Sequence, residues 1–316
     1  MCSRQVETVE PTTDALAASL SERGLVYESR GELDCAIQEF DRAIQLKPDS
    51  SALFNSRGLV YKQKGEKDRA IEDFDRAIHF KPDNVEALNN RGNVRFSQNR
   101  LDDAIEDYDQ AIGFKPDDAE AYNNRGVAYG RKGDLVRAIE DYDRALSLKS
   151  DFAQAYYNRG IVFSRRGNYD RAIAEFSRAL RLKPEFAEAY NNRGSALNMK
   201  GDLDQAIENF TEAIRLKPDC AEAYYNRAVV FFREGKLERT VQDLNDAIRL
   251  KPDYAEAFNE RGDAYAKQGQ LDRAIQDFDE AIRLEPDYAG AQRNRALAYE
   301  QKISRGQVAG EAAVQR

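Results

Sequence analysis

The sequence predicts an all-α solenoid built from repeated pairs of helices. Glycines and prolines recur at intervals of 34 residues or a multiple of 34. The glycines are Gly24, Gly58, Gly92, Gly126, Gly160, Gly194 and Gly262. The prolines are Pro48, Pro82, Pro116, Pro184, Pro218, Pro252 and Pro286. A fixed period of this length is typical of stacked supersecondary units, each of which contacts only its neighbours.

Each unit reads as two helices joined by a short turn, and residues 119–152 illustrate the pattern. Residues 119–129 predict a first helix. Gly133 and Asp134 interrupt it, because glycine tolerates positive φ and aspartate can cap the next helix. Residues 138–146 predict a second helix, and a proline such as Pro116 follows the second helix, which it cannot continue.

This pattern resembles the tetratricopeptide repeat. That family favours an aromatic residue at repeat position 4, Gly at 8, Tyr at 11, Ala at 20, an aromatic residue at 24, Ala at 27 and Pro at 32. The unit 119–152 supplies Tyr122, Gly126, Tyr129, Ala138, Tyr142 and Ala145, with Ser150 at the proline position. The resemblance implies a right-handed superhelical α-solenoid. Position numbers below run from 1 to 34 within each repeat.

Eight repeats in one register account for most of the chain. They are residues 17–50, 51–84, 85–118, 119–152, 153–186, 187–220, 221–254 and 255–288. Residues 289–303 predict a polar helix that caps the stack, since Gln292 stands where the aromatic residue was. We expect residues 1–16 to form a mobile N-terminal segment and residues 304–316 to form a disordered tail.

Small residues predict where the two helices of a repeat approach each other. A glycine inside a helix costs about 1 kcal/mol relative to alanine, so we expect the glycine at position 8 to allow close approach of the alanine at position 20. Repeat 7 departs from this pattern with Ala228, Thr240 and Leu244. We therefore expect its helices to lie slightly further apart and this repeat to be the softest joint.

The composition of the chain indicates which partners it can bind and which cellular compartment suits it. The formal net charge of −8 argues against nucleic acid, whose phosphates need clustered Lys and Arg. Cys2, Cys35 and Cys220 lie far apart and predict neither a disulfide framework nor a zinc site, which favours a reducing, cytoplasmic location. No stretch approaches the roughly 18 apolar residues of a membrane helix, and the first residues contain no apolar signal segment.

Arginine occupies position 7 of every repeat, and an acidic residue at position 23 matches it in all but one. The arginines are Arg23, Arg57, Arg91, Arg125, Arg159, Arg193, Arg227 and Arg261, with Arg295 after them. The acids are Glu39, Asp73, Asp107, Asp141, Glu175, Asp243 and Asp277, and Asn209 breaks the series. One-to-one matching favours structural pairs over a cationic stripe for an acidic ligand. The sequence leaves open whether each arginine pairs within its own repeat or with the preceding one.

Asparagines at positions 5 and 6 predict a peptide-binding site. A carboxamide carries two donors and an acceptor, so a row of them can bond a peptide backbone whatever its side chains are. This is similar to the asparagine ladder in the superhelical repeats of O-linked N-acetylglucosamine transferase. The alternative is that Asn is an inherited surface residue. The candidates are Asn90, Asn124, Asn158, Asn192 and Asn226 at position 6, with Asn123 and Asn191 at position 5.

Aromatic and basic side chains complete the candidate groove. By resemblance, positions 2, 5, 9, 12 and 13 of the first helix face the concave side, and aromatic anchors are a usual source of binding energy. The candidates are Tyr157, Tyr225, Phe96 and Phe232, with Arg131 and Arg165 at a basic edge opposite the glutamates of position 2.

Two further classes of site are not supported by the residues. Chaperone-binding members of the family hold a C-terminal carboxylate with cations at positions 2 and 5, and those cations are missing here although Asn93 matches. His79, the only histidine, sits beside Phe80 and is expected to pack, and no phosphate-binding loop follows a strand. We therefore expect no catalytic residues, no metal site and no cofactor.

The function expected from the sequence is a non-catalytic scaffold that binds an extended segment of a protein partner in its concave groove. Two alternatives stay open: a signalling receptor for a short peptide or small ligand, and an accessory subunit that docks an enzyme through its convex face. The sequence leaves the partner's identity and the oligomeric state undetermined.

Overall fold

The computed structural model describes residues 12–314, with side chains from 12 to 304. This part of the chain contains seventeen α-helices and no strand. The first helices of the repeats, with the terminal helix, are α1 (Thr13–Ser29), α3 (Ser51–Lys64), α5 (Val85–Ser97), α7 (Ala119–Lys132), α9 (Ala153–Arg165), α11 (Ala187–Lys200), α13 (Ala221–Arg233), α15 (Ala255–Lys267) and α17 (Ala289–Val314). The second helices are α2 (Leu33–Leu46), α4 (Lys67–Phe80), α6 (Leu101–Phe114), α8 (Leu135–Leu148), α10 (Tyr169–Leu182), α12 (Leu203–Leu216), α14 (Leu237–Leu250) and α16 (Leu271–Leu284).

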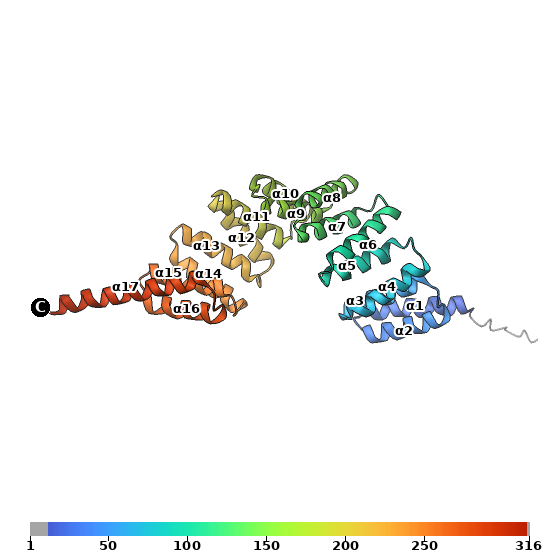
Figure 1. Ribbon diagram of the computed structural model, residues 1–316, viewed down its shortest axis with the longest axis horizontal. Helices are drawn as coiled ribbons and strands as arrows, with labels where there is room; N and C mark the ends of the chain where they lie inside the picture. Colours follow the sequence, from blue (N-terminus) through green and yellow to red (C-terminus); the bar gives the residue numbers. More distant parts are fainter. Residues whose placement is uncertain (1–11, 315–316) are drawn as a thin grey trace, which may run out of the picture. The chain divides into compact units, whose positions relative to one another are not determined.

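The chain divides into two compact units, Met1–Ala155 and Tyr156–Arg316, called unit 1 and unit 2 below. Within unit 1, α3, α5 and α7 each pack against the second helix of their own repeat and against that of the repeat before, and within unit 2 the same holds for α11, α13 and α15 (Figure 1). The predicted all-α architecture of helix pairs is confirmed. A glycine in the left-handed conformation ends several first helices, as Gly133 does after α7 with φ 89°.

The two ends of the predicted repeat array need correction. Helix α1 begins at Thr13, inside the segment expected to be mobile, because Thr12 caps it by accepting a hydrogen bond from the Ala15 amide at 3.2 Å. Helix α17 runs to Val314, beyond the expected end at residue 303, since no proline interrupts this stretch. The other residues expected to be mobile or disordered, 1–11 and 315–316, lie outside the described part of the chain.

The core of each repeat is an aromatic ring held under a glycine. The ring at position 24 is buried in seven repeats, as Tyr142 is with 2% exposure. A Cβ atom added at the glycine of position 8 would lie only 2.6–2.9 Å from this ring. The expected close contact is therefore made mainly with the aromatic residue at position 24, not with the alanine at position 20. At Gly126 the backbone oxygen of Ala138 is also near, 3.2 Å from such a Cβ.

Repeat 7 fills the space between positions 8 and 24 with different residues. Ala228 supplies the methyl group that glycine lacks, and Leu244 replaces the ring that would collide with it. Both are fully buried, and Thr240 is 1% exposed with its hydroxyl donating to the Lys236 carbonyl at 3.1 Å. Because the two changes offset each other in volume, the repeat is filled, and its burial gives no sign of the looseness expected from the sequence.

The arginines at position 7 join neighbouring repeats. Arg125 donates from Nε and Nη2 to Asp141 of its own repeat, at 2.9 and 2.6 Å, and from Nη1 to Asp109 of the preceding repeat at 2.6 Å. Arg57 makes the same bridge between Asp73 and Asp41. We call this arrangement the Arg junction: the arginine at position 7, the residue at position 23 of its repeat and the residue at position 25 of the repeat before. Pairing therefore runs both within and between repeats.

Candidate functional site

Unit 1 contains a cavity of about 1160 Å³ over three consecutive first helices, α3, α5 and α7. Residues at positions 2, 5, 6 and 9 of these helices line it, whereas no residue at positions 12 or 13, which were also expected on this face, is among them. These lining residues are Ala52, Asn55, Ser56, Leu59, Glu86, Asn89, Asn90, Asn93, Glu120 and Asn124. Two residues of the predicted site, Asn90 and Asn124, thus lie in one groove with six other side chains bearing an amide or hydroxyl group: Ser51, Asn55, Ser56, Asn84, Asn89 and Asn93.

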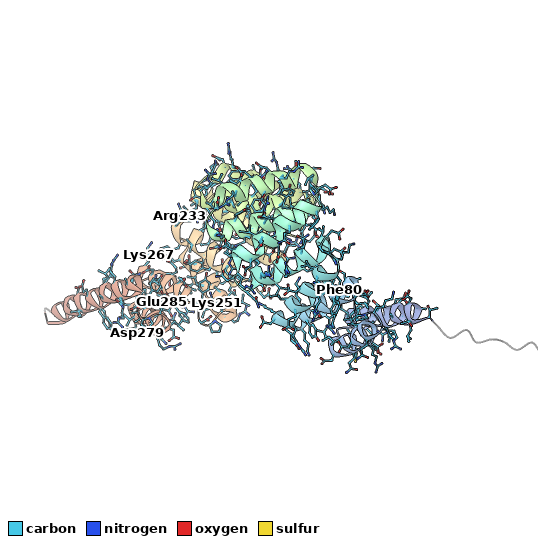
Figure 2. All side chains as sticks on the ribbon, turned by 45° about the vertical axis from the view of Figure 1, so that its right-hand side comes forward. Phe80, Arg233, Lys251, Lys267, Asp279 and Glu285 are labelled. Carbon is cyan, nitrogen blue, oxygen red and sulfur yellow. The ribbon has the colours of Figure 1, made fainter. Side chains whose placement is uncertain are left out.

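Loop residues that sequence reasoning missed also line this cavity. Lys81, Lys115 and Lys149 follow the second helices at position 31, and Asp83 and Asp117 come two residues after the first two of these lysines. The signal was present, because lysine stands at position 31 in seven of the eight repeats. Glu285 is the exception, and it is labelled with its equivalent Lys251 in Figure 2. The groove edge therefore carries both charges within each loop.

The asparagines of position 6 bond to the preceding repeat. In unit 1, Asn90 Nδ2 donates to Asn55 Oδ1 at 3.2 Å. In unit 2, Asn192 Nδ2 donates to the Tyr157 hydroxyl at 3.0 Å, and Asn226 Nδ2 donates to Asn191 Oδ1 at 3.0 Å. The acceptor is each time at position 5, so positions 5 and 6 form a row of hydrogen bonds between successive first helices.

This row uses only part of each carboxamide. A primary amide offers two N–H donors and one carbonyl acceptor. At Asn90, Asn192 and Asn226 one donor serves the neighbouring repeat, and no other hydrogen bond of these side chains is found among the described residues. All three residues are partly exposed. Each therefore keeps one donor and one acceptor, which is what a peptide unit requires.

The remaining asparagines of the predicted site differ in their exposure. Asn123 is 5% exposed, so its amide belongs to the interior more than to the groove. Asn124 is partly exposed and its Oδ1 lies 3.4 Å from Asn123 Nδ2. Asn191 and Asn158 are partly exposed as well. In the same groove, Asn89 donates to Asp118 at 3.2 Å, while its own Oδ1 is buried with no partner among the described residues.

The tyrosines of the predicted site pack between repeats. The Tyr157 ring lies 4.6 Å from Phe186 and 5.9 Å from Phe176, measured between ring centroids. Tyr225 lies 5.0 Å from Tyr254. Burial raises the pKa of both predicted tyrosines. These rings are therefore part of the packing between repeats, and both residues are partly exposed.

A cation of the next repeat covers each predicted phenylalanine. The Arg131 guanidinium lies 5.1 Å from the centroid of Phe96. The ammonium of Lys267, which is labelled in Figure 2, lies 3.7 Å from the centroid of Phe232. Position 13 of one repeat thus covers position 12 of the repeat before it by a cation–π contact. Arg131 in unit 1 and Arg165 in unit 2 are both exposed.

Unit 2 has a smaller cavity of about 410 Å³ near its C-terminal end. Phe232, Asp263 and Lys267 line it together with residues of α17. Burial raises the pKa of Asp263 to about 6. Burial, with a smaller contribution from the Asp263 charge, raises the pKa of Glu260 to about 7. Glu260 occupies position 6, where repeats 3 to 7 hold asparagine, so the predicted row ends at repeat 8 with a carboxyl group.

Three further features concern the lone histidine, metal binding and membrane-spanning helices. His79 contacts the Phe80 ring edge-on at 5.2 Å between centroids, as expected from its packing role, but the residue is exposed. The part of the chain with described side chains holds no group of three or more His, Cys, Asp or Glu placed to bind a metal ion. Within the described residues we find no helix with the length and apolar character needed to cross a membrane.

Family models of the tetratricopeptide repeat match most of the chain. The TPR repeat model matches residues 24–65, 58–98, 92–133, 194–235, 230–269 and 262–302. Two further tetratricopeptide repeat models match residues 157–210 and 119–152. The chain belongs to the tetratricopeptide repeat (TPR) family. No curated protein matches the sequence.

Solved structures of TPR proteins resemble this one. YrrB, described as a TPR protein with an unusual peptide-binding site, is 28% identical with a TM-score of 0.51, over 61% of this chain and 99% of YrrB. A TPR protein from Parabacteroides merdae is 23% identical with a TM-score of 0.60, over 79% of this chain and 98% of its own. Cut9 in complex with Hcn1, from the APC/C, is 16% identical with a TM-score of 0.66, over 93% of this chain and 57% of the matched chain. The last two likenesses concern the fold alone.

Proposed function

We propose that this TPR protein is a non-catalytic scaffold that binds an extended segment of a protein partner in the groove of its first helices. TPR repeats support a role in protein interaction. The segment is held by its backbone, through the carboxamides of position 6. A cytoplasmic location and a partner other than nucleic acid belong to the same proposal, in keeping with the net charge of −8.

The observation that carries the proposal is the unused half of each carboxamide. Asn90 retains one N–H and its carbonyl oxygen after bonding to Asn55, and both residues line the 1160 Å³ cavity. A peptide unit presents one N–H and one C=O, so such an amide can bond it at both groups. Because the bond to Asn55 fixes the Asn90 amide in advance, little side-chain entropy is lost on binding.

The size of the groove sets the length of the segment. The cavity spans three first helices and therefore two repeat steps. Two helix layers of about 8–10 Å give at most roughly 16–20 Å per step, and less on the concave side. At about 3.3 Å per extended residue, each step takes about five residues or fewer. We expect unit 1 to bind a segment of about ten residues. The likeness to YrrB, described as having a peptide-binding site, supports a peptide ligand.

The test compares Asn90→Ala with Asn55→Ala. Both variants remove the same 3.2 Å hydrogen bond, but only the first removes groups that are partly exposed in the groove, since Asn55 is 7% exposed. Dodecapeptides would be selected on the wild-type protein from a random library, and their affinities measured by fluorescence anisotropy. We expect Asn90→Ala to weaken binding at least tenfold beyond Asn55→Ala, at about 1 kcal/mol for each lost hydrogen bond.

Side-chain variants of the selected peptides provide the second arm. If carboxamides bond the backbone, the ratio between the two protein variants stays similar when a peptide side chain is changed. Methylation of single peptide nitrogens should instead abolish the difference at the bonded unit. Equal binding by the two protein variants would move the site away from the asparagines.

A further inference from the structure

The Arg junctions of unit 1 use a carboxylate at position 25. Arg57, Arg91 and Arg125 each donate from Nη1 to an aspartate of the preceding repeat at 2.6 Å. The side chains of these aspartates are 44–51% exposed, whereas those of the three arginines are only 12–19% exposed. Position 25 is therefore the solvent-facing side of the junction. The second carboxylate, at position 23, lies on the buried side.

The junction of Arg193 in unit 2 contains no carboxylate. Its Nε donates to Asn209 Oδ1 at 2.7 Å, and its Nη1 donates to Ser177 Oγ at 3.0 Å. No ion pair of Arg193 is found among the described residues, and its Nη2 makes no hydrogen bond there. The Tyr190 ring, 5.4 Å from the guanidinium carbon, covers one face. Burial lowers the pKa of Arg193, whereas the pKa values of Arg57, Arg91 and Arg125, which have carboxylate partners, are raised.

An anion can reach this guanidinium from the Ser177 side. Ser177 is partly exposed and takes the place held by an exposed aspartate in unit 1. A half-buried cation without a counter-charge carries an uncompensated desolvation cost, which an incoming carboxylate would offset. The planar fork of arginine suits a carboxylate. Nη1, which faces Ser177, donates only to that hydroxyl and so has a second N–H to offer.

The helix that carries Ser177 has the charge that such a ligand needs. Helix α10 holds Arg171, Arg178 and Arg181 against Asp170 and Glu175, a net charge of +1. Each of the other seven second helices has a net charge between −1 and −5. Arg178 and Arg181 are both exposed, one and four residues after Ser177. The uncompensated guanidinium therefore lies beside the one second helix with a positive charge.

We propose that Ser177, Arg178, Arg181, Arg193 and Asn209 form a docking surface for an acidic segment of a protein partner, here called the Arg193 surface. One carboxylate of the segment bonds Arg193 in the place that aspartate occupies in unit 1, and the exposed arginines of α10 receive neighbouring acidic residues. This surface goes beyond the groove function, because none of its residues is at the groove positions 2, 5, 6 or 9.

The test fills the site with a carboxylate from the protein itself. Ser177→Asp restores the position-25 carboxylate of the unit 1 junctions while Asn209 stays at position 23. Five other repeats carry aspartate at position 25, so the variant is expected to fold. Ala174→Glu is the matched control: it adds the same charge to an exposed position of the same helix, where Arg178 is four residues away. The probe is fluorescein-labelled hexaglutamate, titrated against the full chain at low salt.

We expect Ser177→Asp to bind hexaglutamate at least tenfold more weakly than Ala174→Glu, and Ala174→Glu to stay within about threefold of the wild type. A tenfold loss corresponds to about 1.4 kcal/mol. Equal affinities of the two variants would overturn the proposal, since they would show a response to net charge alone. Absence of wild-type binding up to about 1 mM would overturn it as well.

Two more measurements test whether Arg193 lacks a counter-charge and whether the partner is an acidic protein segment. Thermal unfolding should show Ser177→Asp to be more stable than Ala174→Glu, because it supplies the missing counter-charge; no gain would contradict an uncompensated Arg193. A labelled hexathymidylate should bind more weakly than hexaglutamate. If it binds as tightly and loses affinity in Ser177→Asp to the same degree, the surface accepts polyanions in general and the assignment to an acidic protein segment is wrong.

Discussion

The glycine at position 8 is set by the ring at position 24, and repeat 7 shows the alternative solution. In Gly126→Ala, the new methyl carbon would lie 2.8 Å from the Tyr142 ring. We expect a loss of about 2 kcal/mol in the free energy of unfolding, as overpacked cores lose. Combining it with Tyr142→Leu should be less destabilising than the sum of the two single changes, because Ala228 and Leu244 coexist in repeat 7. Urea unfolding of the four proteins measures this coupling, and strict additivity would contradict it.

Arg125 compensates a buried carboxylate, so its removal should be costly in a pH-dependent way. Asp141 is 5% exposed, and burial raises its pKa although Arg125 opposes the shift. In Arg125→Leu that pKa rises further, because the opposing charge is gone. We expect a loss of about 3 kcal/mol at pH 7 that shrinks as the pH falls and the carboxyl group becomes protonated.

Replacing the acid as well checks this interpretation. Arg125→Leu with Asp141→Asn should recover part of the loss at pH 7 and show a smaller difference between pH 4 and pH 7. Thermal unfolding across that range is sufficient. An Arg125→Leu variant as stable as the wild type would show that the series serves binding instead of structure.

Glu260 should make the protein less stable as the pH rises. Its pKa of about 7 in the folded chain is above the ordinary value near 4.3, so the folded state holds a proton that the unfolded state has lost. The resulting stability is present below pH 4 and is lost as the pH rises toward and through about 7. Glu260→Asn removes this group and should raise stability by about 1 kcal/mol at pH 8 and little at pH 4. A gain that is the same at both pH values would contradict the role of the carboxyl group.

The sequence predicted pairs of interacting residues where both residues belong to the same repeat. Arg125 and Asp141 share a repeat, and the matching of positions 7 and 23 indicated the pair. The bond from Arg125 to Asp109 and the bond from Asn90 to Asn55 join different repeats. Their partners depend on how far one repeat is displaced along the next, and a 34-residue period does not encode that displacement. The loop lysines of the groove, such as Lys81, were missed for another reason: position 31 repeats regularly, but it lies outside the first helix, where the groove was expected.

At the scale of the helices, sequence periodicity predicted which elements exist better than where they end. The turns at glycine, and the absence of strands among the described residues, were predicted from local propensity. The extension of α17 to Val314 did not, because no strong stop signal marks either residue 303 or residue 314.

Repeat 7 is the element for which the structure changes an expectation. Ala228, Thr240 and Leu244 of repeat 7 are buried, and Ala228 favours the helix by about 1 kcal/mol over glycine. We now expect backbone amides in α13 and α14 to exchange as slowly as those in α7 and α8. Hydrogen exchange followed by mass spectrometry compares the two pairs under the same conditions. Faster exchange in repeat 7 would support the looser joint that the sequence suggested.

At the scale of the whole molecule, we expect the groove not to bind the chain terminus of a partner. The cations that hold a C-terminal carboxylate in chaperone-binding TPR domains are missing from positions 2 and 5. We expect an acidic chaperone C-terminal peptide to bind equally, within about twofold, as the free acid and as the C-terminal amide. Calorimetry of both forms checks this. A free acid that binds at least tenfold more tightly, by about 1.4 kcal/mol, would show that another clamp exists.

The Arg junction also has a consequence for how such a chain can change its length. Because Arg57, Arg91 and Arg125 of unit 1 meet their acids at fixed positions of the period, removing residues 85–118 would bring Asp75 into the place that Asp109 holds beside Arg125. The new joint would contain the same residue types as the old one, and inserting a copied repeat would create another such joint. Duplication or loss of whole 34-residue segments is therefore nearly neutral for the joints of unit 1, so the number of repeats can change without a change in the chemistry of these joints.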